Sequence, residues 1–399
     1  MSESPIRVGV IGLGRAFTLM LPTFQRDARV TLVAACDPMA VGRDQFVHDF
    51  AGRVYERADA LCADADVEMV YIASPHQCHA EHAALAAAAG KHVLLEKPMA
   101  ITLAECTAMI ANMRAAKRAL IVGHSHSFDG PVRKAREIID SGVVGDVRMI
   151  QALNYSDFLF RPRRPEELRT VDGGGVIHSQ AAHQIDIVRL LGGGMLRSVR
   201  AHTGQWDATR PTEGAYSALL KFEDGAFASL TYSGYGHFDS DHWMDWTGEL
   251  GVKKDARSYG TARKRHATFA SATEEIQAKA ARNYGGSNNP PAPERTSHQH
   301  FGPIIVCCEH GDLRLTPDGV WVYADAECYF DPVPLTDVPR REVIDEIWAT
   351  LRDGKPAAHD GAWARATTEV SLAILESARE DRDVLLHLQV QWQRSSGNV

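Results

Sequence analysis

Short apolar runs alternate with helix-like stretches along the first third of the chain, and this alternation limits the possible folds more than any other feature. The apolar runs lie at Ile6–Ile11, Val30–Cys36, Met69–Ala73, Val93–Glu96 and Ala119–Gly123. Stretches rich in Ala, Leu and charged residues separate them, as at Glu81–Ala89 and Leu103–Ala116. Strands that are buried on both faces and joined by helices form doubly wound parallel sheets. We therefore predict an α/β dinucleotide-binding (Rossmann) domain over residues 1–125.

The pattern changes after residue 125 and predicts an α+β domain over residues 126–399. The predicted helices are Pro131–Ser141, Val176–Leu191 and Gly361–Glu380. The predicted strands are Ser198–Gln205, Ala215–Phe222, Ala226–Ser233, Trp243–Gly251, Gly311–Leu315 and Gly319–Tyr323. Such a run of strands is typical of a largely antiparallel sheet. We expect its open face to mediate self-association, as a dimer or tetramer.

Residues 252–302 differ from both domains, because basic side chains are followed by the turn-rich stretch Gly285–Pro293. The composition indicates an inserted arm. A solvated surface loop, a lid over the site and a subunit contact all remain open for it.

Composition excludes several classes of protein. The 399 residues are 45% hydrophobic and 24% charged, which is typical of a globular protein of two domains at roughly 100–200 residues each. A net charge of −8 argues against a nucleic-acid partner, and no stretch approaches the roughly 20 apolar residues of a membrane span. Met1–Pro5 leaves no room for a signal peptide, and the seven cysteines form no C-x-x-C pair. We expect a cytoplasmic protein with reduced thiols.

A glycine-rich turn follows the first predicted strand. Gly12 permits a tight turn, and Gly14 lets a pyrophosphate approach the backbone N–H groups of a helix that opens at Arg15 and Ala16. Phe17 occupies the place of the third glycine in the usual G-x-G-x-x-G motif. The turn predicts a dinucleotide cofactor.

An acidic residue at the end of the second predicted strand indicates which dinucleotide. Asp37 stands 23 residues after Gly14, where a carboxylate accepts hydrogen bonds from the ribose hydroxyls and repels a 2′-phosphate. We therefore expect NAD. Arg43 keeps NADP open as the alternative.

Two further segments end strands at the same edge of the predicted sheet. The first supplies Ser74, Pro75, His76 and His79 to the cofactor pocket, although His79 also suits a purely structural role. The second is Glu96-Lys97-Pro98. Beside a cationic nicotinamide ring the charged form of Lys97 is disfavoured, which makes it a candidate proton acceptor or donor as well as a possible surface charge.

A histidine-bearing helix follows the glycine run Gly173–Gly175. His183 shares one helix face with Ser179 and Asp186, at spacings of four and three residues. A histidine in this position is a candidate general base, and a structural histidine is the alternative.

Four arginines lie within nine residues of an otherwise acidic chain, after a strand that ends near Tyr155. They are Arg161, Arg163, Arg164 and Arg169. Guanidinium groups bind carboxylates in a bidentate manner, so the cluster favours an anionic substrate, in particular a dicarboxylate. A solvated loop that pairs with Glu166 and Glu167 is the alternative.

A second set of polar residues, His237-x-Asp239-x-Asp241-His242, has the composition of a metal site. Hydride transfer to a dinucleotide requires no metal. We expect none.

Together these motifs resemble the GFO/IDH/MocA (glucose–fructose oxidoreductase/inositol dehydrogenase-like) family. The resemblance rests on the G-x-G turn, Glu96-Lys97-Pro98 and the helix with His183-x-x-Asp186. It covers about residues 5–250 and the helix Trp363–Glu380. It implies that Lys97 and His183 flank the reacting carbinol.

Two departures from the family pattern concern the same region. Ser179 stands where the family usually has aspartate, and Ser127-Phe128 stands where it usually has arginine and phenylalanine. Because a hydroxyl cannot carry a proton as an aspartate does, we expect more of the base work to fall on His183.

Within the family the chain is most similar to the phthalate 4,5-cis-dihydrodiol dehydrogenases. The similarity rests on Gly123–Asp129, Gly173–Asp186, the basic insert and Cys308–Arg314. It implies NAD-dependent oxidation of the cis-4,5-dihydrodiol of phthalate to 4,5-dihydroxyphthalate in the catabolism of aromatic compounds. The substrate-binding residues would be His124, His126, Tyr155, Asp186 and the four arginines. A sugar, inositol or polyol dehydrogenase and a non-catalytic NAD(H) sensor are the alternatives.

Overall fold

The computed structural model of this chain describes residues 4–290 and 293–392, and the chain forms two compact units. Unit 1 holds Met1–His124, Thr273–Ala292 and Thr336–Thr368, and unit 2 holds Ser125–Ala272, Pro293–Leu335 and Glu369–Val399. Of the segment Met1–Pro5, residues 1–3 lie outside the described part. The division differs from the contiguous domains 1–125 and 126–399 expected from the sequence, because two later segments pack with the first 124 residues.

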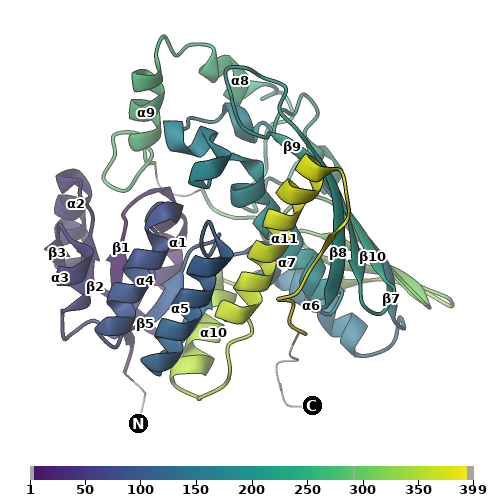
Figure 1. Cartoon of the computed structure of the whole chain (residues 1–399), viewed down its shortest axis with the longest axis horizontal. Coiled ribbons are helices and arrows are strands. Elements are labelled where there is room, and N and C mark those ends of the chain that lie inside the picture. Colours follow the sequence, from purple (N-terminus) through teal and green to yellow (C-terminus); the bar gives the residue numbers. More distant parts are fainter. Residues whose placement is uncertain (1–3, 291–292, 393–399) are drawn as a thin grey trace. The chain divides into compact units, whose positions relative to one another are not determined.

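Unit 1 is built on a parallel sheet with the strand order β3-β2-β1-β4-β5-β6. Figure 1 labels β1, β2, β3 and β5 of this sheet. The strands are β1 (Ile6–Ile11), β2 (Val30–Cys36), β3 (Arg53–Tyr55), β4 (Met69–Ile72), β5 (His92–Leu95) and β6 (Leu120–Val122). The helices are α1 (Arg15–Arg26), α2 (Ala40–Phe50), α3 (Ala58–Cys62), α4 (His79–Ala88), α5 (Leu103–Ala115), α9 (Ala272–Ala280) and α10 (Arg341–Leu351). The predicted doubly wound domain is confirmed. The strand β3 is absent from the prediction because its three residues begin with the charged Arg53 and form no apolar run.

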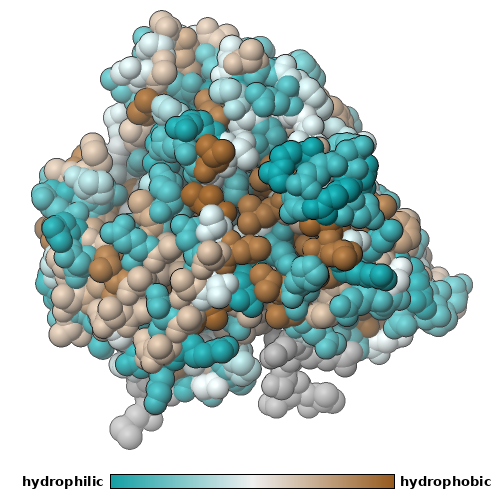
Figure 2. All heavy atoms as spheres, in the orientation of Figure 1, coloured by the Kyte–Doolittle hydropathy of each residue, from teal (hydrophilic) through white to brown (hydrophobic). Residues whose placement is uncertain are grey.

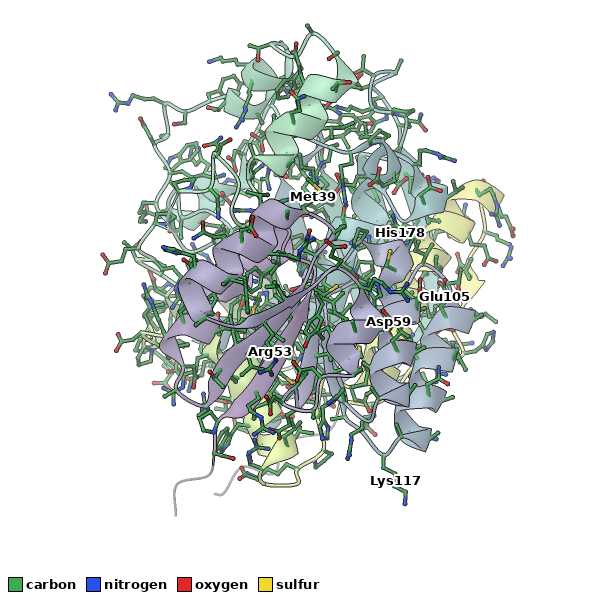
Figure 3. All side chains as sticks on the ribbon, turned by 90° about the vertical axis from the view of Figure 1, so that its left-hand side faces the viewer. Met39, Arg53, Asp59, Glu105, Lys117 and His178 are labelled. Atoms are coloured by element: carbon green, nitrogen blue, oxygen red, sulfur yellow. The ribbon has the colours of Figure 1, made fainter. Side chains whose placement is uncertain are left out.

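The carboxyl ends of these strands form the edge at which such sheets bind ligands. The strand order reverses beside β1, and open α/β sheets hold their ligands outside the strand ends at such a point. Apolar side chains of the strands pack against α3, α4 and α5 in one buried cluster, which fixes the strand ends in place. Figure 3 shows that Met39, just after β2, and Lys117, just before β6, lie at opposite ends of this unit.

Unit 2 is built on a mixed, largely antiparallel sheet with the order β14-β13-β12-β11-β7-β10-β9-β8-β15. The strands are β7 (Val147–Tyr155), β8 (Leu196–Gly204), β9 (Ala215–Phe222), β10 (Phe227–Ser233), β11 (Ile304–Cys308), β12 (Gly311–Thr316), β13 (Gly319–Ala324), β14 (Cys328–Pro332) and β15 (Val384–Leu385). Among the pairs in the described residues, β7 and β10 run parallel and the others run antiparallel. This confirms the predicted α+β architecture.

Two helices of unit 2, α6 (Gly130–Asp140) and α7 (Ala182–Leu191), pack on one face of its sheet. Helix α8 (Thr261–His266) packs instead against the short segment Phe158–Phe160, and the residues of α11 (Gly361–Glu380) are divided between the two units. Alternate strand residues such as Ile150, Leu220 and Leu230 are fully buried on the core side. The residues between them point to the other face, where Leu219, Phe227, Ile305 and Tyr323 are exposed.

Two sequence expectations for unit 2 are corrected. The predicted strand Trp243–Gly251 is wrong: Ser240–Met244 forms a 3-10 helix, and Asp245 and Trp246 adopt left-handed φ angles of 52° and 55° that no strand accepts. The predicted helix Val176–Leu191 is divided into a π-helical segment, Ile177–Ala181, and α7. The arm contains two helices, α8 in unit 2 and α9 almost entirely in unit 1.

The distribution of polar residues on the surface fits the globular protein that the composition predicts. Figure 2 shows hydrophilic residues over most of one face, with hydrophobic residues in smaller groups. Among the described residues, no helix has the length and apolar character needed to cross a membrane.

Candidate active site

The turn after β1 has the geometry of a pyrophosphate cradle. Gly12 has a φ of +95°, and a Cβ atom there would lie 2.8 Å from the backbone of Ala73 and Ser74. A Cβ atom on Gly14 would meet nothing within 4 Å, so the space over the start of α1 is open. No side chain caps that helix, and its first turn, from Arg15 and Ala16 onward, contains no acidic residue. The first N–H groups of α1 can therefore receive the pyrophosphate of a dinucleotide.

Asp37 supports this turn from the end of β2. Its carboxylate accepts hydrogen bonds from the backbone N–H groups of Leu13 and Met39, both at 2.8 Å. Arg43 donates to the backbone oxygen of Asp37 at 2.7 Å and to Glu56 at 2.7 Å. Because Glu56 already neutralises Arg43, this arginine is poorly placed to bind the 2′-phosphate of NADP, and the geometry fits NAD.

His79 ties two loops of the cofactor edge together. Its ring nitrogens lie 3.0 Å from the carbonyl oxygens of Ser74 and Pro98, which belong to the segments after β4 and β5. Burial lowers the pKa of His79 to about 4, so the ring is neutral. This fully buried histidine therefore acts as a support. His76, which precedes it, is partly exposed, as is Pro75.

The Glu96-Lys97-Pro98 segment begins with a buried acid. Glu96 accepts a hydrogen bond from the Tyr71 hydroxyl at 2.7 Å, and burial raises its pKa. This bond fixes the start of the segment, while the side chain of Lys97 is half-buried. Lys97 belongs to unit 1, and the histidine helix belongs to unit 2.

A buried acid explains the glycine run before the histidine helix. Glu213 accepts hydrogen bonds from the hydroxyls of Thr170 and Thr212 and from the backbone N–H of Ile177. A Cβ atom on Gly175 would lie 2.0 Å from a Glu213 oxygen, so only glycine fits there. Sequence reasoning misses Glu213, because nothing near it in the chain indicates a contact with this turn.

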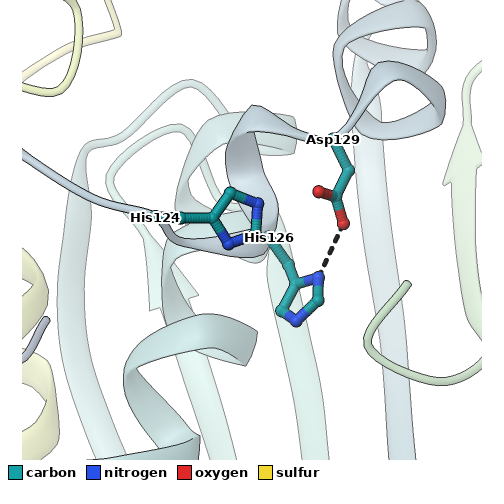
Figure 4. A group of neighbouring side chains, drawn as sticks. All are labelled: His124, His126 and Asp129. Carbon is teal, nitrogen blue, oxygen red and sulfur yellow. Dashed lines mark hydrogen bonds and ion pairs between the residues drawn. The ribbon is translucent and has the colours of Figure 1, made fainter. Parts of the chain in front are cut away.

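His183 lies in a cluster of buried rings in unit 2. It is 5% exposed, and its ring centroid lies 4.7 Å from that of His126 and 5.1 Å from that of Phe301. His126 Nδ1 lies 2.6 Å from an Asp129 oxygen, as Figure 4 shows. His124, drawn in the same figure, ends unit 1 two residues before His126.

The charge of His126 follows from its neighbours. Burial alone would lower its pKa, but the charge and hydrogen bond of Asp129, helped by Glu249, raise the pKa to about 9. Glu249 Oε1 lies 3.6 Å from His126 Nε2. His126 is therefore a buried cation at neutral pH, directly beside His183. The i,i+3 spacing of His126 and Asp129 could have revealed this pair, whereas no local signal points to Glu249 or Phe301.

Asp186 and Ser179 have local partners. Asp186 accepts hydrogen bonds from the hydroxyls of Ser125 and Ser127, so the serine found in place of the family's arginine holds this carboxylate. The Ser179 hydroxyl donates to the carbonyl of Gly175 within the π-helical turn. That bond occupies the hydroxyl hydrogen.

The four arginines do not form one clamp. Their acidic partners are Asp157 and Glu249 for Arg161, Glu166 and Glu167 for Arg164, and Asp172 for Arg169. The guanidinium of Arg163 lies 3.6 Å from the Phe158 ring centroid and donates to the Phe158 carbonyl. Arg169 is 63% exposed at its side chain. Arg161 is linked through Glu249 to His126, while Tyr155 lies at the end of β7 against Phe238.

The acids considered above as a metal site have a cationic partner. Lys254 Nζ lies 2.8 Å from an oxygen of Asp239 and 2.5 Å from one of Asp241. The lysine ammonium thus occupies the place of a metal ion between these carboxylates.

Comparison with known proteins identifies the two halves of the chain. Residues 6–124 match the family model described as an oxidoreductase family with an NAD-binding Rossmann fold, and residues 132–252 match the GFO/IDH/MocA C-terminal domain. The chain is 46% identical over 380 residues to 1-carboxy-3-chloro-3,4-dihydroxycyclohexa-1,5-diene dehydrogenase of Comamonas testosteroni. This alignment covers 94% of this chain and 96% of that protein.

Solved structures show the same fold. A crystal structure of a Bordetella bronchiseptica RB50 protein, 40% identical, covers 96% of this chain and all of its own with a TM-score of 0.90. The WlbA dehydrogenase from Bordetella pertussis, solved in complex with NADH and UDP-GlcNAcA, is 20% identical over 97% of this chain and 99% of its own, with a TM-score of 0.69.

Proposed function

This chain belongs to the GFO/IDH/MocA family of NAD-dependent oxidoreductases, and from that premise we propose that it oxidises the cis-dihydrodiol of an aromatic carboxylic acid. The relative from Comamonas testosteroni is named for a substrate of this kind, a carboxylated dihydroxycyclohexadiene. The phthalate cis-4,5-dihydrodiol is the member of this class that we expect to react best, giving 4,5-dihydroxyphthalate.

The observation that carries the proposal is a carboxylate held by cations beside His183. Glu249 lies 3.6 Å from His126 Nε2 and 3.9 Å from Arg161 Nη1. Both contacts are ion pairs, and Glu249 helps to raise the pKa of His126. A substrate carboxylate can compete for the same cations. A neutral sugar or polyol carries no charge with which to compete for these cations.

The proposed chemistry divides between the cofactor and the chain. NAD, when bound, accepts the hydride that leaves the carbinol carbon. The imidazole of His183 accepts the hydroxyl proton as the hydride leaves, and Lys97 is proposed as a second proton-transfer group on the strength of its motif. Loss of the second ring hydrogen by enolisation then restores the aromatic ring, which drives the oxidation forward.

Our proposed substrate has a second carboxylate, which the compound in the relative's name lacks, and it lacks that compound's chlorine. The guanidinium of Arg163 stacks on the Phe158 ring, 3.6 Å from its centroid, and donates to the Phe158 carbonyl. We propose that Arg161 and His126 receive one carboxylate and Arg163 the other. A monocarboxylated dihydrodiol would then bind through the first position alone.

The test is formation of NADH, followed by absorbance, with the full chain and NAD. The panel contains phthalate cis-4,5-dihydrodiol, a cis-dihydrodiol with one carboxylate, an uncharged benzene cis-dihydrodiol, and a set of sugars and inositols. We expect turnover with both carboxylated dihydrodiols, a higher kcat/KM for phthalate, and little turnover with the uncharged ring.

Each other outcome has a meaning. Turnover with neutral polyols alone would replace the substrate class and leave His183 in place. NADH binding without turnover of any member would point to a non-catalytic sensor. A preference for the monocarboxylated ring would keep the dihydrodiol chemistry and remove the role given to Arg163.

We also propose that the chain self-associates through the open face of the sheet in unit 2, in the cytoplasm. Leu219, Phe227, Ile305 and Tyr323 are 40–43% exposed there, and covering them would bury apolar surface. Phe227→Asp should lower the mass found by light scattering to that of one chain, while Val143→Asp, at another exposed apolar position, should not. An unchanged mass for Phe227→Asp would remove this interface.

A further inference from the structure

Part of the inserted arm belongs to the cofactor-binding unit, and Tyr284 attaches it there. The backbone N–H of Tyr284 donates to the carbonyl of Leu13 at 3.1 Å. Its ring packs edge-on against Phe17 of α1, with the centroids 5.1 Å apart. Its hydroxyl donates to Asp49 at 2.5 Å, near the end of α2. Tyr284 is 4% exposed, so these contacts enclose it.

The residues next to Tyr284 form backbone hydrogen bonds with one another. The N–H of Gly286 donates to the carbonyl of Asn283, and the N–H of Asn288 donates to the carbonyl of Ala281. Gly285 has a φ of +74°, and a Cβ atom there would lie 2.7 Å from the carbonyl oxygen of Val41. Glycine therefore lets the segment lie directly against the start of α2.

The contact made by Tyr284 falls on the turn that receives the cofactor. Leu13 stands between Gly12 and Gly14, and its N–H donates to Asp37. The two backbone groups of Leu13 are thus held from opposite sides, one by Asp37 at the end of β2 and one by Tyr284 from the arm. In sheets of this kind the pyrophosphate binds at this turn, and the acid after the second strand binds the adenosine ribose.

We propose that Tyr284 is a positioning residue for NAD, and that residues 281–288 form a wall of the adenosine half of the cofactor site. The arm lies against the turn, α1 and the start of α2, which are the elements that flank Asp37. It holds the Gly12–Gly14 turn in the shape that exposes the N–H groups of α1. Residues 281–288 are therefore part of the proposed cofactor site, whereas the part of the arm in unit 2 is not.

The test measures NADH binding to the full chain by fluorescence, so it needs no substrate and does not depend on the reaction proposed above. Tyr284→Ala should raise the Kd for NADH at least about tenfold, because both the ring packing and the support of the turn are lost. Tyr284→Phe keeps the ring and loses the bond to Asp49, and should raise the Kd about twofold to fourfold. Tyr259→Ala removes a 60% exposed tyrosine from the part of the arm in unit 2 and should leave the Kd unchanged.

Hydrogen exchange on the unmodified protein gives a second readout that no substitution can compromise. Saturating NADH should slow exchange in residues 281–288 together with that of the Gly12–Gly14 turn. If NADH protects the turn and leaves residues 281–288 unchanged, the proposal is wrong. The proposal is also wrong if Tyr284→Ala lowers the melting temperature of the folded protein but leaves the Kd for NADH unchanged. Tyr284 would then have a structural role alone.

Discussion

The cofactor turn of unit 1 and the surroundings of His183 in unit 2 are built from different chemical groups. In unit 1 the cofactor turn consists of backbone groups, held by Asp37 and Tyr284 and kept open at Gly14. In unit 2 the surroundings of His183 consist of buried charges, above all His126 with Asp129. A backbone site is sensitive to an added Cβ atom and insensitive to pH. A site of buried charges is sensitive to pH and to the loss of one partner.

The largest expected effect comes from the proposed base in unit 2. His183→Ala should lower kcat about 10²–10⁴-fold, the range typical of general base catalysis. Ser179→Ala should lower it far less, because its hydroxyl is bonded to the carbonyl of Gly175. Steady-state kinetics on the preferred dihydrodiol checks both. Equal losses in the two variants would contradict this division of roles.

The next effect tests whether unit 1 depends on space rather than charge. Gly14→Ala should leave the melting temperature unchanged, since its Cβ meets nothing within 4 Å, but should raise the Kd for NADH about tenfold by obstructing the pyrophosphate. Gly12→Ala should lower the melting temperature as well, because of its φ of +95° and its close approach to Ala73. Thermal melts with and without NADH measure both. If Gly14→Ala bound NADH normally, the turn would not be the pyrophosphate site.

A third effect separates the arginines of unit 2. Arg163→Ala should raise the KM for the phthalate dihydrodiol about tenfold, the cost of one lost bond to a charged group, with the KM for NAD unchanged. Arg169→Ala is the matched control, because its side chain is 63% exposed and paired with Asp172. Similar KM values for the two variants would mean that the cluster is a solvated loop.

The smallest effect is a shift along the pH axis. The pKa of His126 is raised to about 9, above its ordinary value of 6.5. The protonated form therefore contributes stability and substrate binding in full below about pH 6.5, and both decline as the pH rises through 9. The KM for a carboxylated substrate should rise severalfold above pH 9.

Asp129→Asn should move that rise to lower pH, because it removes the charge that holds the proton on His126. The KM for NAD, set in unit 1, should show no matching change in either protein. A pH profile that does not respond to Asp129→Asn would show that another group controls it.

The sequence predicted the backbone turn of unit 1 more completely than the buried charges around His183 in unit 2. The strand, turn and helix that carry Gly12 and Gly14 form one continuous stretch, so a local pattern was sufficient. The partners of His126 and of Leu13 were only partly visible: Asp129 is three residues from His126, but Glu249 is 123 residues from His126 and Tyr284 is 271 residues from Leu13. The predicted strand Trp243–Gly251 failed because its apolar residues hide two left-handed backbone positions.

The arm also bears on how the protein can be made. Unit 1 includes Thr273–Ala292 and Thr336–Thr368 as well as the first 124 residues, so three separate segments of the gene encode it. Arg352 and Glu68 pair at 2.6 Å across such a gap. During synthesis on the ribosome the sheet of unit 1 can form early, but Tyr284 and Arg352 emerge only after most of unit 2. A gene truncated after residue 124 would therefore encode the sheet of unit 1 without the later segments that complete this unit. Unit 1 cannot be exchanged between proteins as one continuous segment of the gene.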